Sequence, residues 1–206
     1  MAIELESGTL VPVAASIGGT ILWDDESEDD PFLGHAIRVD FEPLPGREGE
    51  AHPQLHVHSI RLPVRSWRQL QGRSFTFPNV VRKIYADGEE VPILDIHGSL
   101  RLGSDYHNAQ VSEIRFGERT GCRIGVAVTG ELVIGKQAPI PFGLEVPVEL
   151  SPVRVTGDVA TGEFPDLQQA AELAGRLLTT ADYREPEVVD GCVEYSPDYG
   201  PAQGAE

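Results

Sequence analysis

The sequence has little cysteine and no long apolar run. Its two cysteines, Cys122 and Cys192, lie far apart and form no CxxC motif, so free thiols are expected in a reducing cytosol. No apolar stretch approaches the roughly 20 residues that a helix needs to cross a bilayer. The opening residues, MAIELESG, have neither the basic nor the apolar region of a secretory signal. These absences predict a cytoplasmic protein without membrane contact.

Acidic residues are absent from 51–86, although the chain has 33 acidic and 16 basic residues and a net charge of −17. The net charge is −10 over 1–50, +3 over 51–124 and −10 over 125–206. One interpretation is that the basic middle pairs with the acidic flanks within one fold. Another is that acidic surface attracts a basic protein partner. Nucleic acid is disfavoured, because a chain this negative repels phosphate.

An arginine between two apolar residues is the recurring pattern. Because side chains alternate between the faces of a strand, each triplet places two apolar groups on one face and the arginine on the other. In a helix the three residues would spread over about 200° and make a poor core stripe. The pattern favours antiparallel sheet with one buried face. The arginines concerned are Arg38, Arg61, Arg101, Arg115 and Arg154.

Alternation and turn residues predict a mainly β fold, an antiparallel β-sandwich or open barrel of about nine to twelve strands. Gly18-Gly19 and Asp87-Gly88 are hairpin signals. Ser66 is expected to cap a short helical turn that Gly72 ends. Strands are expected over 10–17, 20–23, 35–41, 54–62, 74–77, 80–86, 89–93, 94–102, 109–116, 122–129, 132–134, 144–150 and 153–155.

One amphipathic helix is expected over 165–178. Its apolar residues recur with 3.6-residue spacing, Asp166 complements its dipole, and Gly175 would allow close approach to a neighbour. We expect a single β-rich domain over 1–180 that includes this helix, then an extended or partly disordered acidic tail over 181–206. The apolar stripe comprises Leu167, Ala170, Ala171, Ala174, Leu177 and Leu178.

Residues 23–30 read WDDESEDD. Calcium prefers carboxylate oxygens, but the glycine and the distal glutamate of an EF-hand loop are absent and Pro31 follows. A solvated, self-repelling loop is one interpretation, and a binding site for a basic protein is the other. The candidate partner-binding residues are Asp24, Asp25, Glu26, Glu28, Asp29 and Asp30.

His56 and His58 fall on one face of a predicted strand, about 6.6 Å apart along it. This spacing suits chelation of one metal ion with a third ligand. On strict alternation, Ile60 and Leu62 would share their face, and Leu55 and Val57 would lie opposite. The interpretation without metal is two exposed histidines on a half-buried strand. Candidates for the third ligand are His52, His97 and His107.

The HxH pair is similar to the start of the cupin metal motif. That motif continues with a glutamate four or five residues later and a further histidine after a PxG turn. Leu62 and Pro63 occupy the glutamate positions here, and no histidine follows Pro141-Phe142-Gly143. The similarity therefore ends after two ligands, and no cofactor is predicted from it.

Residues 130–136 read GELVIGK, close to a phosphate-binding loop. Gln137 replaces the required hydroxyl residue, and Pro139 and Pro141 block the helix that should follow. We interpret this stretch as a strand. The sequence also lacks GxSxG and HExxH, so no motif indicates an enzyme, and a catalytic cluster assembled in three dimensions stays an alternative.

Three functions remain from the sequence. The preferred one is a non-enzymatic intracellular binding protein that recognises a protein partner through acidic surface, as an immunity protein or an assembly factor would. The second is a metal- or small-ligand-binding β-barrel that uses His56 and His58. The third is a hydrolase whose site has no sequence motif.

Overall fold

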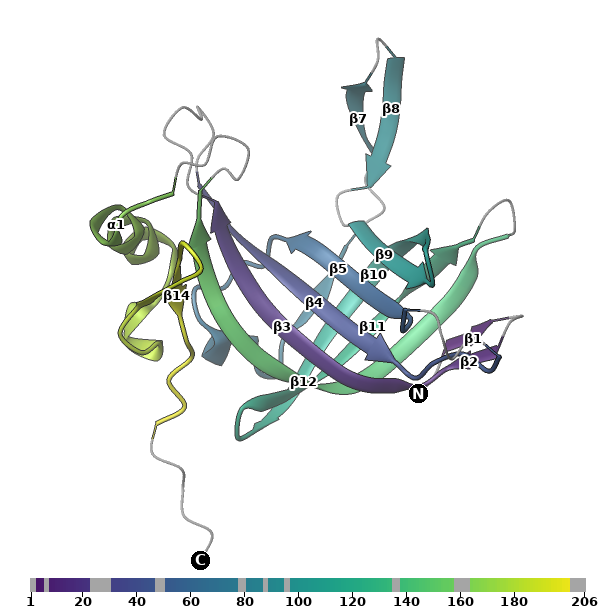
Figure 1. The fold of residues 1–206 in the computed structure, drawn as a ribbon, viewed down its shortest axis with the longest axis horizontal. Coiled ribbons are helices and arrows are strands. Elements are labelled where there is room, and N and C mark those ends of the chain that lie inside the picture. Colours follow the sequence, from purple (N-terminus) through teal and green to yellow (C-terminus); the bar gives the residue numbers. More distant parts are fainter. Residues whose placement is uncertain are drawn as a thin grey trace, which may run out of the picture.

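The fold is given by a computed structural model, which describes residues 3–5, 8–22, 31–46, 51–77, 81–86, 89–94, 97–134, 138–157 and 164–200. It is mainly β, with a large curved sheet and a helix at one end (Figure 1). The predicted class, an antiparallel β-sandwich or open barrel with a C-terminal helix, is confirmed.

Seven strands pair around a circuit, so that the sheet curls into a barrel. Neighbours are antiparallel except where β3 and β12 meet in parallel. β12 closes the circuit, because its first part pairs with β11 and its last part pairs with β3. In order around the circuit, the strands are β3 (Pro12–Leu22), β4 (Leu33–Phe41), β5 (Gln54–Ile60), β9 (His97–Leu102), β10 (Asp105–Thr120), β11 (Arg123–Val133) and β12 (Ile140–Thr156).

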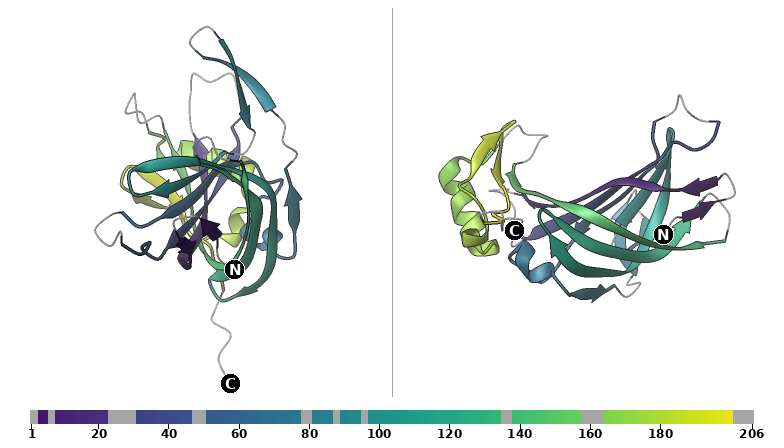
Figure 2. Two further views of the ribbon diagram at one scale, coloured as in Figure 1. Left: turned by 90° about the vertical axis from the view of Figure 1, so that its right-hand side faces the viewer. Right: turned by 90° about the horizontal axis from the view of Figure 1, so that it is seen from below.

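Smaller strands are added to this barrel. β6 (Ser74–Thr76) pairs with β10, and β1 (Ile3–Leu5) pairs with β2 (Gly8–Leu10). Among the described strands, β7 (Val81–Ala86) and β8 (Glu89–Leu94) pair only with each other. They flank the predicted Asp87-Gly88 turn, which itself lies outside the described residues. This hairpin stands clear of the barrel (Figure 1, Figure 2).

Period-two alternation separates core from solvent, as predicted. Ile37 and Val39 are fully buried, whereas Arg38 between them is exposed. The other four triplets follow the same rule, with Arg101 half-buried and the remaining three arginines exposed. The apolar side chains on the opposite face fill the barrel interior, as expected for a small barrel.

A β-bulge in β5 interrupts the alternation. Opposite β4, three residue steps of β5 between Val57 and Ile60 match two steps of β4. The extra residue brings Ile60 to the buried face, together with Leu55 and Val57. The prediction that Ile60 shares the face of His56 and His58 is therefore wrong, because regular alternation does not anticipate a bulge.

Gly18-Gly19 lies within β3 and makes no hairpin turn, so that prediction is wrong. β3 continues through both residues without interruption. A Cβ on Gly19 would lie 2.8 Å from Leu33 Cδ1 and 3.0 Å from Val153 Cγ2. Close packing against neighbouring side chains explains this glycine, which marks a crowded strand position.

Residues 164–200, called here the C-terminal unit, pack at one end of the barrel (Figure 1). β14 pairs with β12, and Tyr183 and Tyr195 are buried. Residues 181–200, expected to begin an extended or partly disordered tail, contain a short hairpin that is anchored by aromatic side chains. The unit contains α1 (Leu167–Leu177), η2 (Thr180–Asp182), β13 (Glu187–Val189) and β14 (Cys192–Tyr195).

Helix α1 starts at a capping box. The Asp166 carboxylate accepts a hydrogen bond from the Gln169 N–H, and the Gln169 side chain accepts one from the Asp166 N–H. The helix buries Ala170 and Ala174. Leu167, which the periodicity placed in the apolar stripe, is 53 % exposed. The buried face is therefore narrower than predicted.

Candidate functional site

The acidic run predicted as a partner site lies outside the described residues. Leu22 before it and Phe32 after Pro31 are 53 % and 36 % exposed. The Arg61 guanidinium lies 3.7 Å from the centroid of the Phe32 ring. Two exposed apolar side chains, one stacked with a cation, therefore flank the run. The six predicted residues are Asp24, Asp25, Glu26, Glu28, Asp29 and Asp30.

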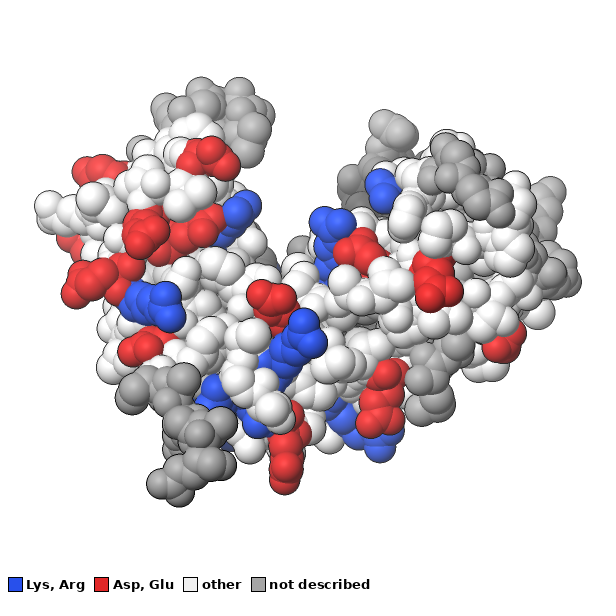
Figure 3. All heavy atoms as spheres, turned by 60° about the horizontal axis from the view of Figure 1, so that its bottom comes forward, with Lys and Arg blue, Asp and Glu red and all other residues white. Residues whose placement is uncertain are grey.

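Carboxylates also gather on the C-terminal unit. Residues 164–200 contain eight acidic and two basic residues, a net charge of −6. Acidic side chains are prominent over this unit, at the left of Figure 3. The exposed carboxylates are Asp166, Glu172, Glu185, Glu187 and Asp190.

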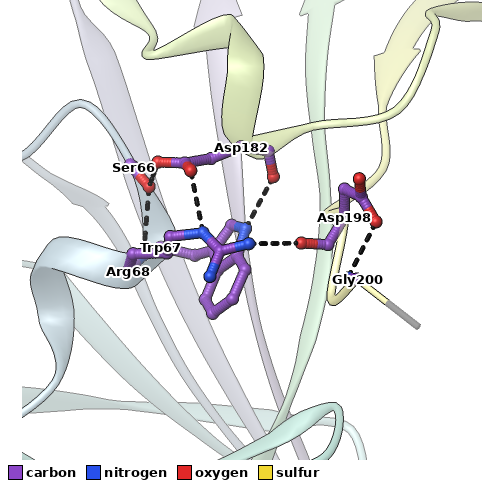
Figure 4. Close-up of polar contacts among 6 residues, drawn as sticks. All are labelled: Ser66, Trp67, Arg68, Asp182, Asp198 and Gly200. Carbon is purple, nitrogen blue, oxygen red and sulfur yellow. Dashed lines mark hydrogen bonds and ion pairs between the residues drawn. The ribbon is translucent and has the colours of Figure 1, made fainter. Parts of the chain in front are cut away.

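Asp182 is the centre of the contact between the C-terminal unit and η1 (Trp67–Leu70) (Figure 4). Its carboxylate accepts a hydrogen bond from the Ser66 hydroxyl and pairs with Arg68 Nε at 2.8 Å. Its backbone carbonyl accepts a hydrogen bond from Trp67 Nε1 at 2.8 Å. Ser66 caps η1 as predicted. The capped turn therefore presents three donors to one aspartate.

Arg65 extends this contact to helix α1. Its Nη2 atom donates to the carbonyls of Gly175 and Leu178, at 3.0 Å and 3.3 Å, where a cation also stabilises the negative end of the helix dipole. The expected close packing at the Cα of Gly175 is not seen, because a Cβ there would have no described atom outside its own helix within 4 Å. Arg65 and Arg68 belong to the basic middle of the sequence. Part of this positive charge is therefore neutralised or hydrogen-bonded within the fold.

His56 and His58 lie side by side on the outer face of β5. Their ring centroids are 5.3 Å apart. Partial burial, with the proximity of His58 and Arg38, lowers the pKa of His56, which favours the neutral imidazole that binds metal. His52 and His107 do not complete a group of three ligands in the described part of the chain.

His97 is the remaining candidate ligand, and its side chain is not among those that the structure describes. The metal site therefore stays a prediction. Metal analysis of the purified chain, with and without the paired substitutions His56→Ala and His58→Ala, is the measurement that decides it.

His35 is a buried titratable group that the sequence did not single out. It faces the barrel interior on β4 and is 7 % exposed, and its Nδ1 atom has no hydrogen-bond partner among the described residues. A cavity of about 20 Å³ lies beside it, lined in part by Gly19, Trp67 and Tyr183. Burial lowers the pKa of His35 to about 4, although a hydrogen bond to the backbone of Ile60 opposes this shift.

Because His35 is buried, we predict that the free energy of unfolding decreases as the pH falls from 6.5 to about 4. In this window the unfolded chain protonates the histidine while the folded chain keeps it neutral, so proton binding favours unfolding. The full difference amounts to about 3 kcal/mol. Urea denaturation at several pH values measures it. His35→Gln should flatten the profile, whereas His52→Gln, at an exposed site, should not; equal slopes for the two variants would contradict the assignment.

A groove opens where β3 and β12 separate. The two strands pair from Ser16 and Glu149 onward, and they diverge before these residues. The resulting hollow, called here the fork groove, has a volume of about 190 Å³. The described residues that line it include no serine, cysteine or histidine. Its lining residues are Pro12, Val13, Ala14, Ala15, Arg123, Val146, Pro147 and Glu149.

Comparison with protein-family models, curated proteins and solved structures finds no match. No helix among the described residues is long and apolar enough to cross a membrane.

The fork groove, His35 and the Asp182 contact were not predicted from the sequence. The one available signal was the cluster of Val11, Pro12 and Val13, which is apolar yet interrupted by a residue that strands tolerate mainly at edges.

Proposed function

We propose that the chain is a non-enzymatic binding protein that recognises a basic protein partner through acidic surface. The observation that carries the proposal is that the C-terminal unit exposes several carboxylates on its outer surface. Its exposed carboxylates include Glu185, Glu187 and Asp190 on and beside β13. A surface of one sign attracts a partner of opposite sign and speeds their encounter.

Two cations that face the C-terminal unit pair with acids of that unit. Arg68 pairs with Asp182, and Arg154 Nη2 lies 2.7 Å from Glu194 Oε1. Both acids are largely shielded from solvent in these pairs, with 21 % and 12 % of their side-chain surface exposed. Asp182 and Glu194 thus stabilise the fold through ion pairs. The exposed carboxylates on and beside β13 are therefore the candidates for partner recognition.

The barrel interior offers less support for binding a small ligand. Side chains from every strand of the circuit are buried in one apolar cluster, and the cavity beside His35 has a volume of only about 20 Å³. Small-molecule sites usually have volumes of about 300–1,000 Å³. An external surface is therefore the better candidate for function.

Charge reversal tests the proposal. A partner captured from a lysate is purified and titrated against the full chain and against the variant Glu185→Lys/Glu187→Lys/Asp190→Lys. We expect the variant to bind about tenfold more weakly at low salt, and the wild-type affinity to fall as salt rises. Calorimetry or surface plasmon resonance measures both effects.

The matched control reverses three exposed acids on the barrel, with Asp105→Lys/Glu118→Lys/Glu131→Lys, and so changes the net charge equally. Its binding should weaken less than that of the C-terminal variant. A further variant, in which the six acids of 23–30 are replaced by amides, tests whether that run contributes. Binding that ignores salt and both sets of reversals would refute recognition by acidic surface.

A further inference from the structure

The fork groove lies between two strand edges that no described strand covers. Residues 12–15 of β3 pair only with β4, and residues 140–148 of β12 pair only with β11. The β1–β2 hairpin lies between the more widely separated ends of the two strands (Figure 2). Near the point of divergence the hollow stays open, and Val13 at its wall is 57 % exposed.

Prolines make this edge a poor template for an added strand. Leu150 N donates to the Cys122 carbonyl next to β11, so alternate residues of β12 direct their N–H groups to the other edge. Pro141 and Pro147 fall in that second set and have no N–H to offer. Blunting by proline disfavours strand addition. The groove therefore suits an apolar side chain better than a paired backbone.

Charged residues stand beside the apolar lining. Glu149 lies opposite Arg123 in the register of β11 and β12, and Glu145 lies on the same face of β12 as Glu149. All three are exposed. The groove itself is lined by one carboxylate, Glu149, and one guanidinium, Arg123, and Glu145, next to Val146 in the chain, adds a second carboxylate beside it. An apolar side chain with a cation beside it matches the apolar lining and these two carboxylates.

We propose that the fork groove docks a short segment of the partner in which an apolar side chain is flanked by lysine or arginine. This inference rests on the proposed function, because it gives the basic partner a specific docking point. The apolar side chain would contact Val13, Val146 and Pro147, and the flanking cation would lie near Glu145 and Glu149. A segment whose carboxylate binds Arg123 is the competing occupant.

The probes are three blocked peptides with the sequences GKLKG, GKSKG and GELEG, each titrated into the ¹⁵N-labelled full chain by NMR. We expect GKLKG to shift the amides of Ala14, Ala15 and Gly125 with a Kd in the millimolar range. Loss of the buried leucine in GKSKG should weaken binding at least about tenfold, and GELEG should bind more weakly still. Absence of localised shifts, or equal binding of all three peptides, would overturn the proposal.

Substitutions of Arg123 and Glu149 separate the two possible occupants by sign. Arg123→Ala should tighten GKLKG binding about threefold, and Glu149→Gln should weaken it to a similar extent. Tighter binding of GELEG than of GKLKG, lost in Arg123→Ala, would identify a carboxylate occupant and overturn ours. Val13→Asp should abolish the localised shifts. Val13 is exposed, so an unchanged melting temperature is expected for this variant.

The same variants distinguish failure of the groove from failure of the function. If Val13→Asp leaves the affinity of the purified partner unchanged while the C-terminal charge reversal weakens it, the groove proposal fails and the proposed function stands. If neither change affects the affinity, both fail. If both weaken it, both are supported.

Discussion

Trp67→Ala is expected to lower the free energy of unfolding by about 4 kcal/mol. The side chain is 6 % exposed, and its ring lies 5.4 Å from that of Tyr199. Its indole N–H donates to the Asp182 carbonyl. The substitution therefore leaves a cavity under the C-terminal unit and removes a donor that holds η2. For a chain of this length the melting temperature should fall by about 8–16 °C.

Two further measurements show whether Trp67 acts as the anchor of the C-terminal unit. Hydrogen exchange should accelerate in β13 and β14 of Trp67→Ala more than in β10 and β11, because β12 is the one described barrel strand with which β14 pairs. Trp67→Phe, which keeps the ring but loses the donor, should cost about 1–2 kcal/mol. Uniform exchange throughout the barrel, or equal costs for the two substitutions, would count against this role.

Gly130→Ala is expected to cost about 4 kcal/mol, at the upper end for overpacking. Gly130 lies on β11 between Val111 of β10 and Phe142 of β12. A Cβ there would overlap the backbone carbonyl of Gln110 and lie 3.0 Å from Phe142 Cε1. Because one of these neighbours is backbone, relief requires the adjacent strand to move.

Gly125→Ala is the matched control on the same strand. A Cβ at Gly125 would have Gly117 Cα as its nearest neighbour, at 4.0 Å. This substitution should change the free energy of unfolding by less than about 1 kcal/mol. Chemical denaturation of both variants makes the comparison, and a tolerated Gly130→Ala would show that β10 and β11 separate easily.

The alternation of apolar residues with arginine predicted the fold class because it depends only on neighbouring residues. The same local rule failed at Ile60, where a bulge shifts the strand by one position. It also misassigned Gly18-Gly19, because a glycine required by crowding has the same letter as a glycine in a turn. The parallel contact of β3 with β12 had no local signal, since it joins segments more than 130 residues apart.

Candidate sites were harder to predict for the same reason. The histidine pair at His56 and His58 was visible because its members are two residues apart. The fork groove forms where distant segments diverge, and the Asp182 contact joins residues more than 110 positions apart. Only the three-dimensional arrangement brings such residues together. Composition therefore predicted that the protein is acidic, but it did not predict where on the folded surface the exposed carboxylates lie.

The position of β12 also limits when the chain can fold during synthesis. One edge of β3 and one edge of β11 stay unpaired until β12 is synthesised, because Glu149 of β12 pairs with Ser16 and with Arg123. Until residues 140–156 leave the ribosome, the nascent chain presents two unpaired edges, which are prone to aggregation. Contacts of such long sequence separation also slow folding. Late closure of the barrel is therefore expected to prolong the exposure of these two edges.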